Sequence, residues 1–272
     1  MKKKVLVGML YSGESEYEES VASLNAQSLN SWDLYEIKNQ PKKVAHDSLY
    51  GYFMSQSNNY EYFLKLDADM VFVSKNTLQE MVDTFEINNL AHLMSYVRDV
   101  PSGIDIPGIQ MFRSDSKWLG SNDPLNTDYA PKIFGNSVSV LDKHWINHMP
   151  NSTDYQLFRY GIHKALKSLQ PDRENKSFHK FLMHLNILQG IARHAFTKPE
   201  SGYFYSLIGA TLVAEGRYNE IEHNTEQAKK IFEKMQNKPH VLENYREVSL
   251  NYWRNEIQSS YKWYALLSKM RP

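Results

Sequence analysis

The sequence predicts an α/β protein, with a doubly wound, mostly parallel β-sheet flanked by helices and a helical subdomain at the C-terminal end. Strand-like and helix-like patterns alternate through residues 4–73, which is the order of parallel strands joined by crossover helices. Residues 177–272 have an almost entirely helical period instead. The 272 residues, 42% of them hydrophobic, are enough to bury one large core and to form a smaller appendage.

The first three strands and two helices are predicted by hydrophobic period. Residues 4–11 form a run of mainly aliphatic residues, which predicts a buried strand, and Ser12-Gly13-Glu14 predicts the turn after it. Residues 17–27 come next and have apolar side chains at helical spacing, which predicts an amphipathic helix. The same reasoning along the chain predicts strands at 4–11, 32–37 and 62–66 and helices at 17–27 and 45–56. Such sheets bind nucleotides at the carboxyl ends of their strands.

Beyond residue 73 the alternation is less regular. The pattern predicts helices at 76–86 and 154–169 and strands at 93–97, 109–112 and 133–141. Segment 99–128 is rich in Pro, Gly, Ser and Asp, and we expect a long loop there that holds acceptor-binding residues. The polar run 171–176 is the best linker, so we predict an α/β domain at 1–174 and a helical subdomain at 175–272.

The composition excludes several classes of function. Lys plus Arg and Asp plus Glu both number 31, so no net charge attracts nucleic acid. The absence of cysteine excludes a disulfide framework, a thiolate zinc site and a cysteine nucleophile, and it fits a reducing cytosol. The apolar run after the N-terminal lysines is short and precedes a polar turn, so we interpret it as a strand, not a signal peptide. No apolar run approaches the roughly 20 residues of a membrane span.

The acidic triplet Asp67-Ala68-Asp69 follows the apolar run 62–66. Two carboxylates two residues apart at the end of a strand are expected to point to the same side, at the ligand-binding edge of the sheet. Two uncompensated anions there would repel each other and would be costly to desolvate. A divalent cation such as Mg²⁺ or Mn²⁺, holding a diphosphate, is the natural partner. A pair of solvated loop aspartates is the alternative.

Three segments occur in a fixed order: Ser23-Leu24-Asn25-Ala26-Gln27-Ser28, Ala45-His46-Asp47 and Lys65-Leu66-Asp67-Ala68-Asp69. Together they resemble the nucleotide-sugar half of a GT-A glycosyltransferase, closest to family 2. The resemblance covers residues 5–73 well, 133–167 loosely and the C-terminal third hardly at all. It implies a GT-A fold with a mixed, mostly parallel sheet. It also implies a nucleotide-diphosphate sugar as donor, with a UDP-sugar as the first candidate, and Mn²⁺ or Mg²⁺ as the metal cofactor.

The resemblance also assigns roles to individual residues. Asp69 would coordinate the cation that bridges the donor diphosphate, and Asp67 would contact the ribose, the metal or its water shell. The remaining donor-binding residues would be Leu10, Tyr11, Ser12, Glu14, His46, Asp47 and Lys65. Tyr11 would stack on the base, or it is an ordinary core aromatic. His46 stands where the family has arginine, and a neutral imidazole offers less to a phosphate.

The second half of the site leaves two assignments open. Inverting family members have a Glu-Asp pair as catalytic base after the late strand, and Asp154 is the nearest substitute here. Asp154 is otherwise an ordinary first-turn acid of a helix. His148 resembles the late histidine that serves some GT-A families as a metal ligand, and the alternative is an ordinary surface or core histidine. The stereochemical outcome, inverting or retaining, stays open.

The expected function is a cytoplasmic, metal-dependent glycosyltransferase of surface polysaccharide assembly, which moves a sugar to a glycan or lipid-linked acceptor. The aromatic and basic C-terminal stretch 245–270 permits contact with the inner face of the cell membrane or a homodimer through the C-terminal helices. Two alternatives remain. Asp67 and Asp69 also fit the D-x-D-x-V motif of haloacid dehalogenase-like phosphatases, with Asp67 as nucleophile. The second alternative is a protein with a GT-A fold that binds a partner and catalyses no reaction.

Overall fold

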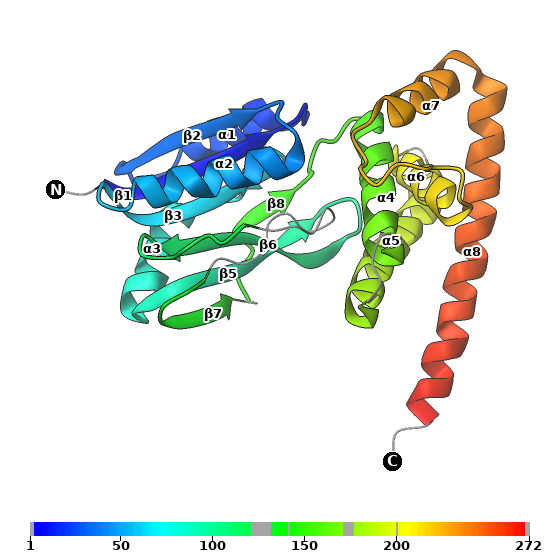
Figure 1. Cartoon of the computed structure of the whole chain (residues 1–272). Coiled ribbons are helices and arrows are strands. Elements are labelled where there is room, and N and C mark those ends of the chain that lie inside the picture. Colours follow the sequence, from blue (N-terminus) through cyan, green and yellow to red (C-terminus); the bar gives the residue numbers. More distant parts are fainter. Residues whose placement is uncertain (1–2, 121–131, 141, 171–176, 200, 270–272) are drawn as a thin grey trace. The chain divides into compact units, whose positions relative to one another are not determined.

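The computed structural model describes residues 3–120, 132–140, 142–170, 177–199 and 201–269, with side chains placed for residues 4–256 of these ranges. Strands and helices are both present up to residue 148, and the described elements from residue 154 onward are all helices (Figure 1). In chain order they are β1 (Lys3–Tyr11), α1 (Tyr17–Asn25), β2 (Trp32–Lys38), α2 (Lys42–Ser55), β3 (Tyr60–Asp67), β4 (Met70–Phe72), α3 (Thr77–Ile87), β5 (Leu90–Asp99), β6 (Ile104–Arg113), β7 (Asn136–Val140), β8 (Ile146–His148), α4 (Asp154–Leu169), α5 (Phe178–Thr197), α6 (Tyr203–Ala214), α7 (Glu226–Asn237) and α8 (Pro239–Lys269).

The strands form one sheet in the order β2-β1-β3-β6-β5-β8-β4, with β7 beside β5. β1 lies parallel to β2 and β3, and β5 lies parallel to β7 and β8. The pairs β3–β6, β5–β6 and β4–β8 are antiparallel. The predicted fold class, a mixed and mostly parallel sheet with flanking helices, is confirmed. The strand predicted at 109–112 begins at Ile104 and lies antiparallel in the middle of the sheet, because it returns from β5 as a hairpin neighbour.

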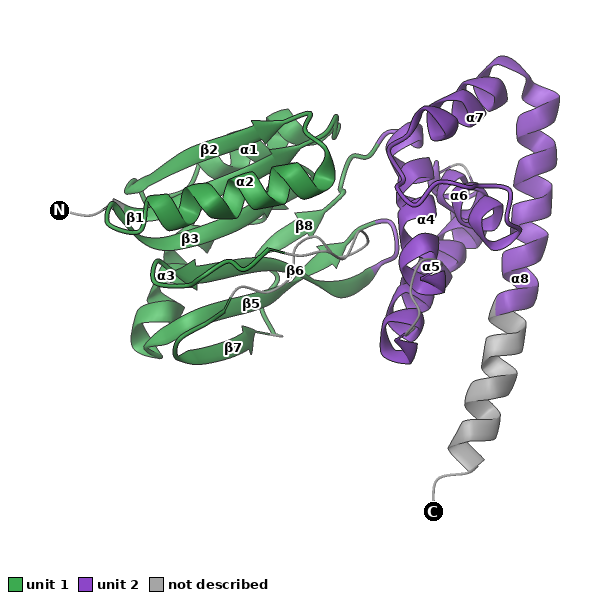
Figure 2. Cartoon of the chain, in the orientation of Figure 1, with its two compact units in different colours: residues 1–100, 104–152 green, residues 101–103, 153–272 purple. Residues whose placement is uncertain are grey.

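The described chain divides into two compact units (Figure 2). Unit 1 comprises residues 1–100 and 104–152, and unit 2 comprises 101–103 and 153–272. Helix α4, which we expected in the first domain, belongs to unit 2 because it packs closely on α6. A Cβ added to Gly161 would lie 1.8 Å from the backbone oxygen of Ser206, and Ser206 Oγ donates to the Leu157 carbonyl at 2.7 Å. The predicted linker at 171–176 lies outside the described residues.

Unit 1 packs α2 against one face of the sheet. Leu49 and Phe53 of α2 are fully buried there, and Gly8 of β1 leaves the space that they occupy. A Cβ at Gly8 would lie 2.4 Å from both side chains. The register between β1 and β3 places Lys65 beside Gly8 and Asp67 beside Leu10. The packing of α2 therefore sets the position of the strand ends where the candidate site lies.

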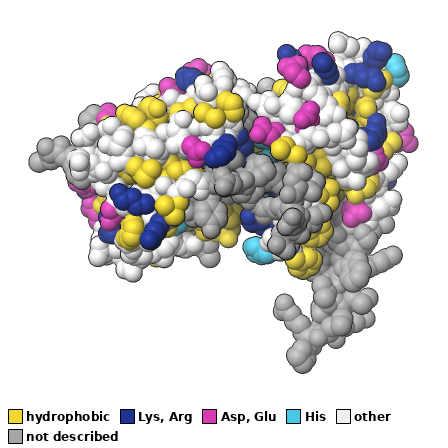
Figure 3. Space-filling view, in the orientation of Figure 1, with side chains coloured by type: hydrophobic (Ala, Val, Ile, Leu, Met, Phe, Trp, Pro, Cys, Tyr) yellow, Lys and Arg dark blue, Asp and Glu magenta, His cyan; other side chains and the backbone are white. Residues whose placement is uncertain are grey.

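No described helix combines the length and the apolar composition that a membrane span requires. On the face drawn in Figure 3, acidic and basic side chains lie in small separate groups over both units.

Candidate functional site

The carboxylate of Asp67, at the end of β3, has a partner within its own strand. Lys65 Nζ lies 2.8 Å from Asp67 Oδ1 and 3.1 Å from Oδ2. The Lys65 side chain is 6% exposed and that of Asp67 is 37% exposed, so the ammonium is buried and the carboxylate reaches solvent. Lys65 and Asp67 are two residues apart in a strand and so share a face. The charge of Asp67 is thus compensated by the chain itself.

The second carboxylate lies in a different setting. Strand β3 ends at Asp67, so Asp69 lies in the turn before β4, and the alternation that would place both acids on one side does not extend to it. Asp69 Oδ2 lies 3.4 Å from His148 Nε2. Asp69 Oδ1 is buried and has no hydrogen-bond partner among the described residues. A buried carboxylate oxygen without a partner is costly, so this atom indicates a place for a cation or a donor.

His148 is held between two carboxylates. Its Nδ1 lies 2.7 Å from Oδ1 of Asp99, which is fully buried at the end of β5. Burial alone would lower the pKa of His148, but the charges of Asp69 and Asp99 and their hydrogen bonds outweigh it and raise the pKa to about 10. Sequence analysis singled out His148 and Asp69 but missed Asp99, because the contact depends on the pairing of β5 with the three-residue strand β8.

Glu14 adds a further acid near Asp69. It accepts hydrogen bonds from Ser12 N and Ser12 Oγ, both at 2.5 Å, which close the turn after β1. Burial raises the pKa of the Glu14 carboxyl, and the charge of Asp69 raises it further. The turn after β1 and the turn after β3 therefore place acidic groups within electrostatic reach of each other, at the carboxyl ends of two parallel strands.

The metal set predicted from the sequence is only partly assembled. Within the residues that the structure describes, no three His, Cys, Asp or Glu side chains are grouped so that they could hold a metal ion. Lys65 holds Asp67 in an ion pair, whereas Asp69 and His148 lie together. Mg²⁺ or Mn²⁺ in nucleotide sites commonly takes one or two protein ligands and completes its shell with phosphate oxygens and water. The donor set of Asp69 and His148, with its unpartnered oxygen, fits such a two-residue site provided that the cation displaces the proton on Nε2 of His148.

The aromatic residue predicted to hold the base lies in a polar cluster at the ends of β1 and β2. The rings of Tyr11 and Tyr17 are 4.6 Å apart at 47°, and Lys38 Nζ lies 4.4 Å from the centroid of the Tyr17 ring. Tyr17 OH donates to Glu36 at 2.5 Å. Tyr11 is partly exposed. Leu10 instead packs against the buried cluster under α2.

Sequence analysis missed Tyr17, Glu36 and Lys38 as members of this cluster. The available signal was their position in the sequence. Glu36 lies at the end of the second predicted strand, Lys38 follows that strand directly, and Tyr17 begins the first predicted helix. Strand β2 lies beside β1 in parallel, which brings these ends together.

His46 and Asp47 of α2 have structural partners. His46 is buried and its Nδ1 lies 2.8 Å from the Lys42 carbonyl oxygen. Asp47 pairs with Lys43 at 2.7 Å and accepts from Trp118 Nε1 at 3.3 Å. The hydrogen bond from Lys43 lowers the pKa of Asp47. These contacts occupy the groups that the family resemblance placed near the donor sugar.

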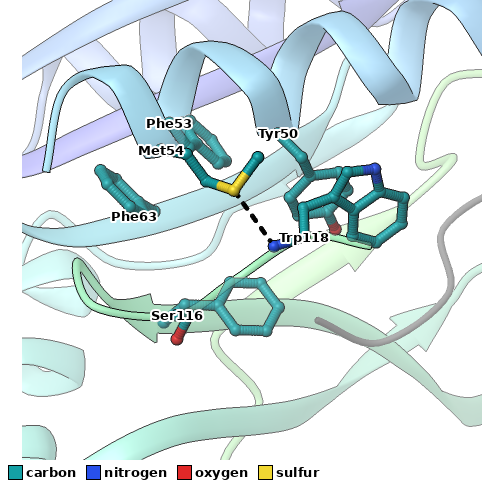
Figure 4. A pocket seen from close by; sticks show the side chains of 7 residues that line it. Tyr50, Phe53, Met54, Phe63, Ser116 and Trp118 are labelled. Carbon is teal, nitrogen blue, oxygen red and sulfur yellow. Dashed lines mark hydrogen bonds between the residues drawn. The ribbon is translucent and has the colours of Figure 1, made fainter. Parts of the chain in front are cut away.

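A small cavity lies under α2 beside the same tryptophan (Figure 4). The ring of Trp118 stacks on Tyr50 at 3.9 Å and 10°, and Trp118 N donates to the Met54 sulfur at 3.3 Å. The remaining lining residues are Phe53, Phe63, Phe112 and Ser116. Its volume of about 10 Å³ is room for about one water molecule, so the cavity is part of the core and not a ligand site.

Asp154, the predicted base, is the first residue of α4 in unit 2. Thr153 caps this helix by accepting from Gln156 N at 3.3 Å. Gly202 approaches Asp154 so closely that an added Cβ would lie 2.4 Å from Oδ1. Partial burial raises the pKa of Asp154. Its assignment as a base stays a prediction.

No protein-family model matches the sequence, and no curated protein matches it. Two solved glycosyltransferase structures are similar to the chain. One is a mannosyltransferase from Pyrobaculum calidifontis in complex with GDP-Man and Mn²⁺, with 12% identity and a TM-score of 0.37 over 94% of this chain and 87% of that one. The other is a glycosyltransferase involved in the glycosylation of the major capsid of PBCV-1, with 13% identity and a TM-score of 0.35 over 54% of this chain and 94% of that one. Both TM-scores are below 0.5, so neither similarity establishes the function of this chain.

Proposed function

We propose that this protein is a metal-dependent glycosyltransferase that uses a nucleotide-diphosphate sugar as donor. One observation carries the proposal: the buried carboxylate of Asp69 has an unpartnered oxygen, lies beside the imidazole of His148, and follows the strand end where α/β sheets bind nucleotides. A divalent cation bound there would satisfy the oxygen and would stabilise the negative charge of a departing nucleoside diphosphate.

The neighbouring residues have consistent roles in this proposal. Lys65 keeps Asp67 oriented as a hydrogen-bond acceptor, which suits a ribose hydroxyl better than a second metal ligand. Tyr11, partly exposed beside Tyr17, offers an aromatic face for the base. Ser12 and Glu14 shape the turn between these two contacts.

Several finer assignments belong to the same proposal. A UDP-sugar is the first donor to test and GDP-mannose, which the Pyrobaculum calidifontis enzyme binds, is the second. We propose a glycan or lipid-linked acceptor, a hexosyl transfer in bacterial surface polysaccharide assembly, and a cytoplasmic location with contact at the membrane surface. Asp154 is the proposed base. A homodimer through the C-terminal helices remains part of the proposal.

The substitution Asp69→Asn tests the central claim because it keeps the shape of the side chain and removes its charge. With Mn²⁺ and the preferred donor, we expect the wild-type protein to release nucleoside diphosphate and Asp69→Asn to lose about 100-fold or more of this turnover. Asp83→Asn, on the exposed side of α3, is the matched control and should behave as wild type. Comparable turnover in Asp69→Asn would refute the proposed chemistry.

Two ligand measurements separate the alternatives. Mn²⁺-dependent stabilisation by a nucleoside diphosphate supports a transferase, because a ligand that binds only the native state raises its melting temperature. Stabilisation by beryllium fluoride with Mg²⁺ would instead support a phosphatase that uses Asp67 as nucleophile. If neither ligand changes the melting temperature, the noncatalytic alternative is favoured.

A further inference from the structure

We propose that Asp99 is a positioning residue for the metal site: its buried carboxylate holds Nδ1 of His148 and thereby aims Nε2 at the carboxylate of Asp69. This inference rests on the proposed function and extends it by one residue that the sequence motifs do not include. Asp99 touches neither the donor nor the cation in this proposal, and it acts through His148.

The backbone fixes the three residues relative to one another. Asp99 of β5 is in register with His148 of β8, and Val100 N donates to the His148 carbonyl at 3.1 Å. Met149 N donates to the Asp69 carbonyl at 2.8 Å, and Met70 of β4 pairs with His148. Three strands therefore meet at this histidine, and the side-chain contacts follow from their pairing.

The geometry of the imidazole shows what Asp99 adds. Asp69 already lies beside Nε2, so the histidine would have one carboxylate partner without Asp99. The bond of 2.7 Å from Nδ1 to Asp99 Oδ1 fixes the other side of the ring. A ring turned over by 180° would present carbon where Nδ1 now meets Asp99. Histidines that bind metals usually donate their second ring N–H to such a carboxylate, which sets the tautomer and the orientation.

The burial of Asp99 argues against a role in stability alone. Its side chain is fully buried, and taking a carboxylate out of water costs several kcal/mol that an ion pair does not reliably recover. Apolar residues of similar volume often serve as well or better at such positions. A charged residue at this place is therefore better explained by the orientation that it gives to His148.

The test measures metal binding directly, by the electron paramagnetic resonance signal of free Mn²⁺, with and without UDP or GDP. We expect the Kd for Mn²⁺ to rise about 10-fold to 100-fold in Asp99→Asn. The control is Asp105→Asn on the neighbouring strand β6, which removes the ion pair between Asp105 and Arg98. This variant should bind Mn²⁺ as wild type does. A second readout is the nitrogen NMR spectrum of His148 with Mg²⁺ and nucleotide, where we expect an Nδ1-protonated ring in wild type and a mixture of tautomers in Asp99→Asn.

The outcomes separate this inference from the proposed function. If wild type binds no Mn²⁺ with either nucleotide, the proposed function fails, and the role of Asp99 fails with it. If wild type binds Mn²⁺ and folded Asp99→Asn binds it equally well with an unchanged His148 spectrum, only the role of Asp99 is refuted. If Asp99→Asn does not fold, Asp99→Glu keeps the charge and shifts the carboxylate by one methylene. Weaker Mn²⁺ binding by folded Asp99→Glu would support the proposal, and wild-type affinity would overturn it.

Discussion

At the scale of single residues, the site separates two carboxylates that look equivalent in the sequence. Asp67 is paired with the buried ammonium of Lys65, whereas Asp69 faces His148 and has an oxygen without a partner. A bound cation is therefore not needed to compensate both acids, because Lys65 pairs with Asp67 and, in the absence of a cation, the protonated imidazole of His148 faces Asp69. What remains for a cation is the unpartnered oxygen of Asp69, together with Nε2 of His148 after it has lost its proton.

This difference predicts unequal effects on stability. Asp67→Ala leaves the ammonium of Lys65 buried without its carboxylate, so we expect a loss of about 1–3 kcal/mol in the free energy of unfolding. Lys65→Met should cost less, because the aliphatic chain is kept and Asp67 reaches solvent. Urea denaturation of both variants measures the two losses.

The double variant Lys65→Met/Asp67→Ala is the control for the pair. If the ion pair explains the loss, the double variant should be more stable than Asp67→Ala, because the buried ammonium that has lost the carboxylate of Asp67 is no longer present. Equal stability of Asp67→Ala and wild type would contradict the pairing.

At the scale of elements, local pattern predicted the helices and the first three strands well. Helix α4 has its predicted bounds, 154–169, because Thr153 caps its start and apolar period continues to its end. The short strands β4 and β8 were not predicted, since three residues carry no period and their existence depends on pairing with each other and with β5. The residues that depend on these strands, Asp99 above all, could not be found from the sequence for the same reason.

The fit of α2 on the sheet gives a prediction at this scale. Gly8→Ala should lower the free energy of unfolding by about 1–3 kcal/mol, because the new methyl would overlap Leu49 and Phe53 in a packed core. Gly51→Ala is the matched control on α2, where an added Cβ meets nothing within 4 Å. It should leave stability unchanged or raise it by up to about 1 kcal/mol, since alanine favours the helix. Urea denaturation compares the two, and equal midpoints would contradict the packing described here.

At the scale of the whole molecule, the chain forms two units with separate cores. The sequence predicted a helical C-terminal part but placed its start at 175, because the polar run 171–176 is a stronger local signal than the Ser152–Thr153 junction where the units divide. The close approach of α4 and α6 at Gly161 is not visible in the sequence, since it joins residues far apart in the chain.

A buried histidine in unit 2, His184, gives a prediction for the pH dependence of stability. Burial, together with repulsion from Lys164, Lys167 and Lys180, lowers the pKa of His184 to about 2. The unfolded chain binds this proton near the ordinary value of 6.5, so the stability that neutral His184 permits is complete above pH 6.5 and declines as the pH falls toward 2. The expected slope is up to about 1.4 kcal/mol per pH unit.

Hydrogen exchange, corrected for intrinsic rates, should become faster in residues 177–199 and 203–214 when the pH is lowered from 7 to 5. His184→Leu, similar in size and unable to titrate, should flatten this dependence, and an unchanged slope in that variant would show that another group is responsible.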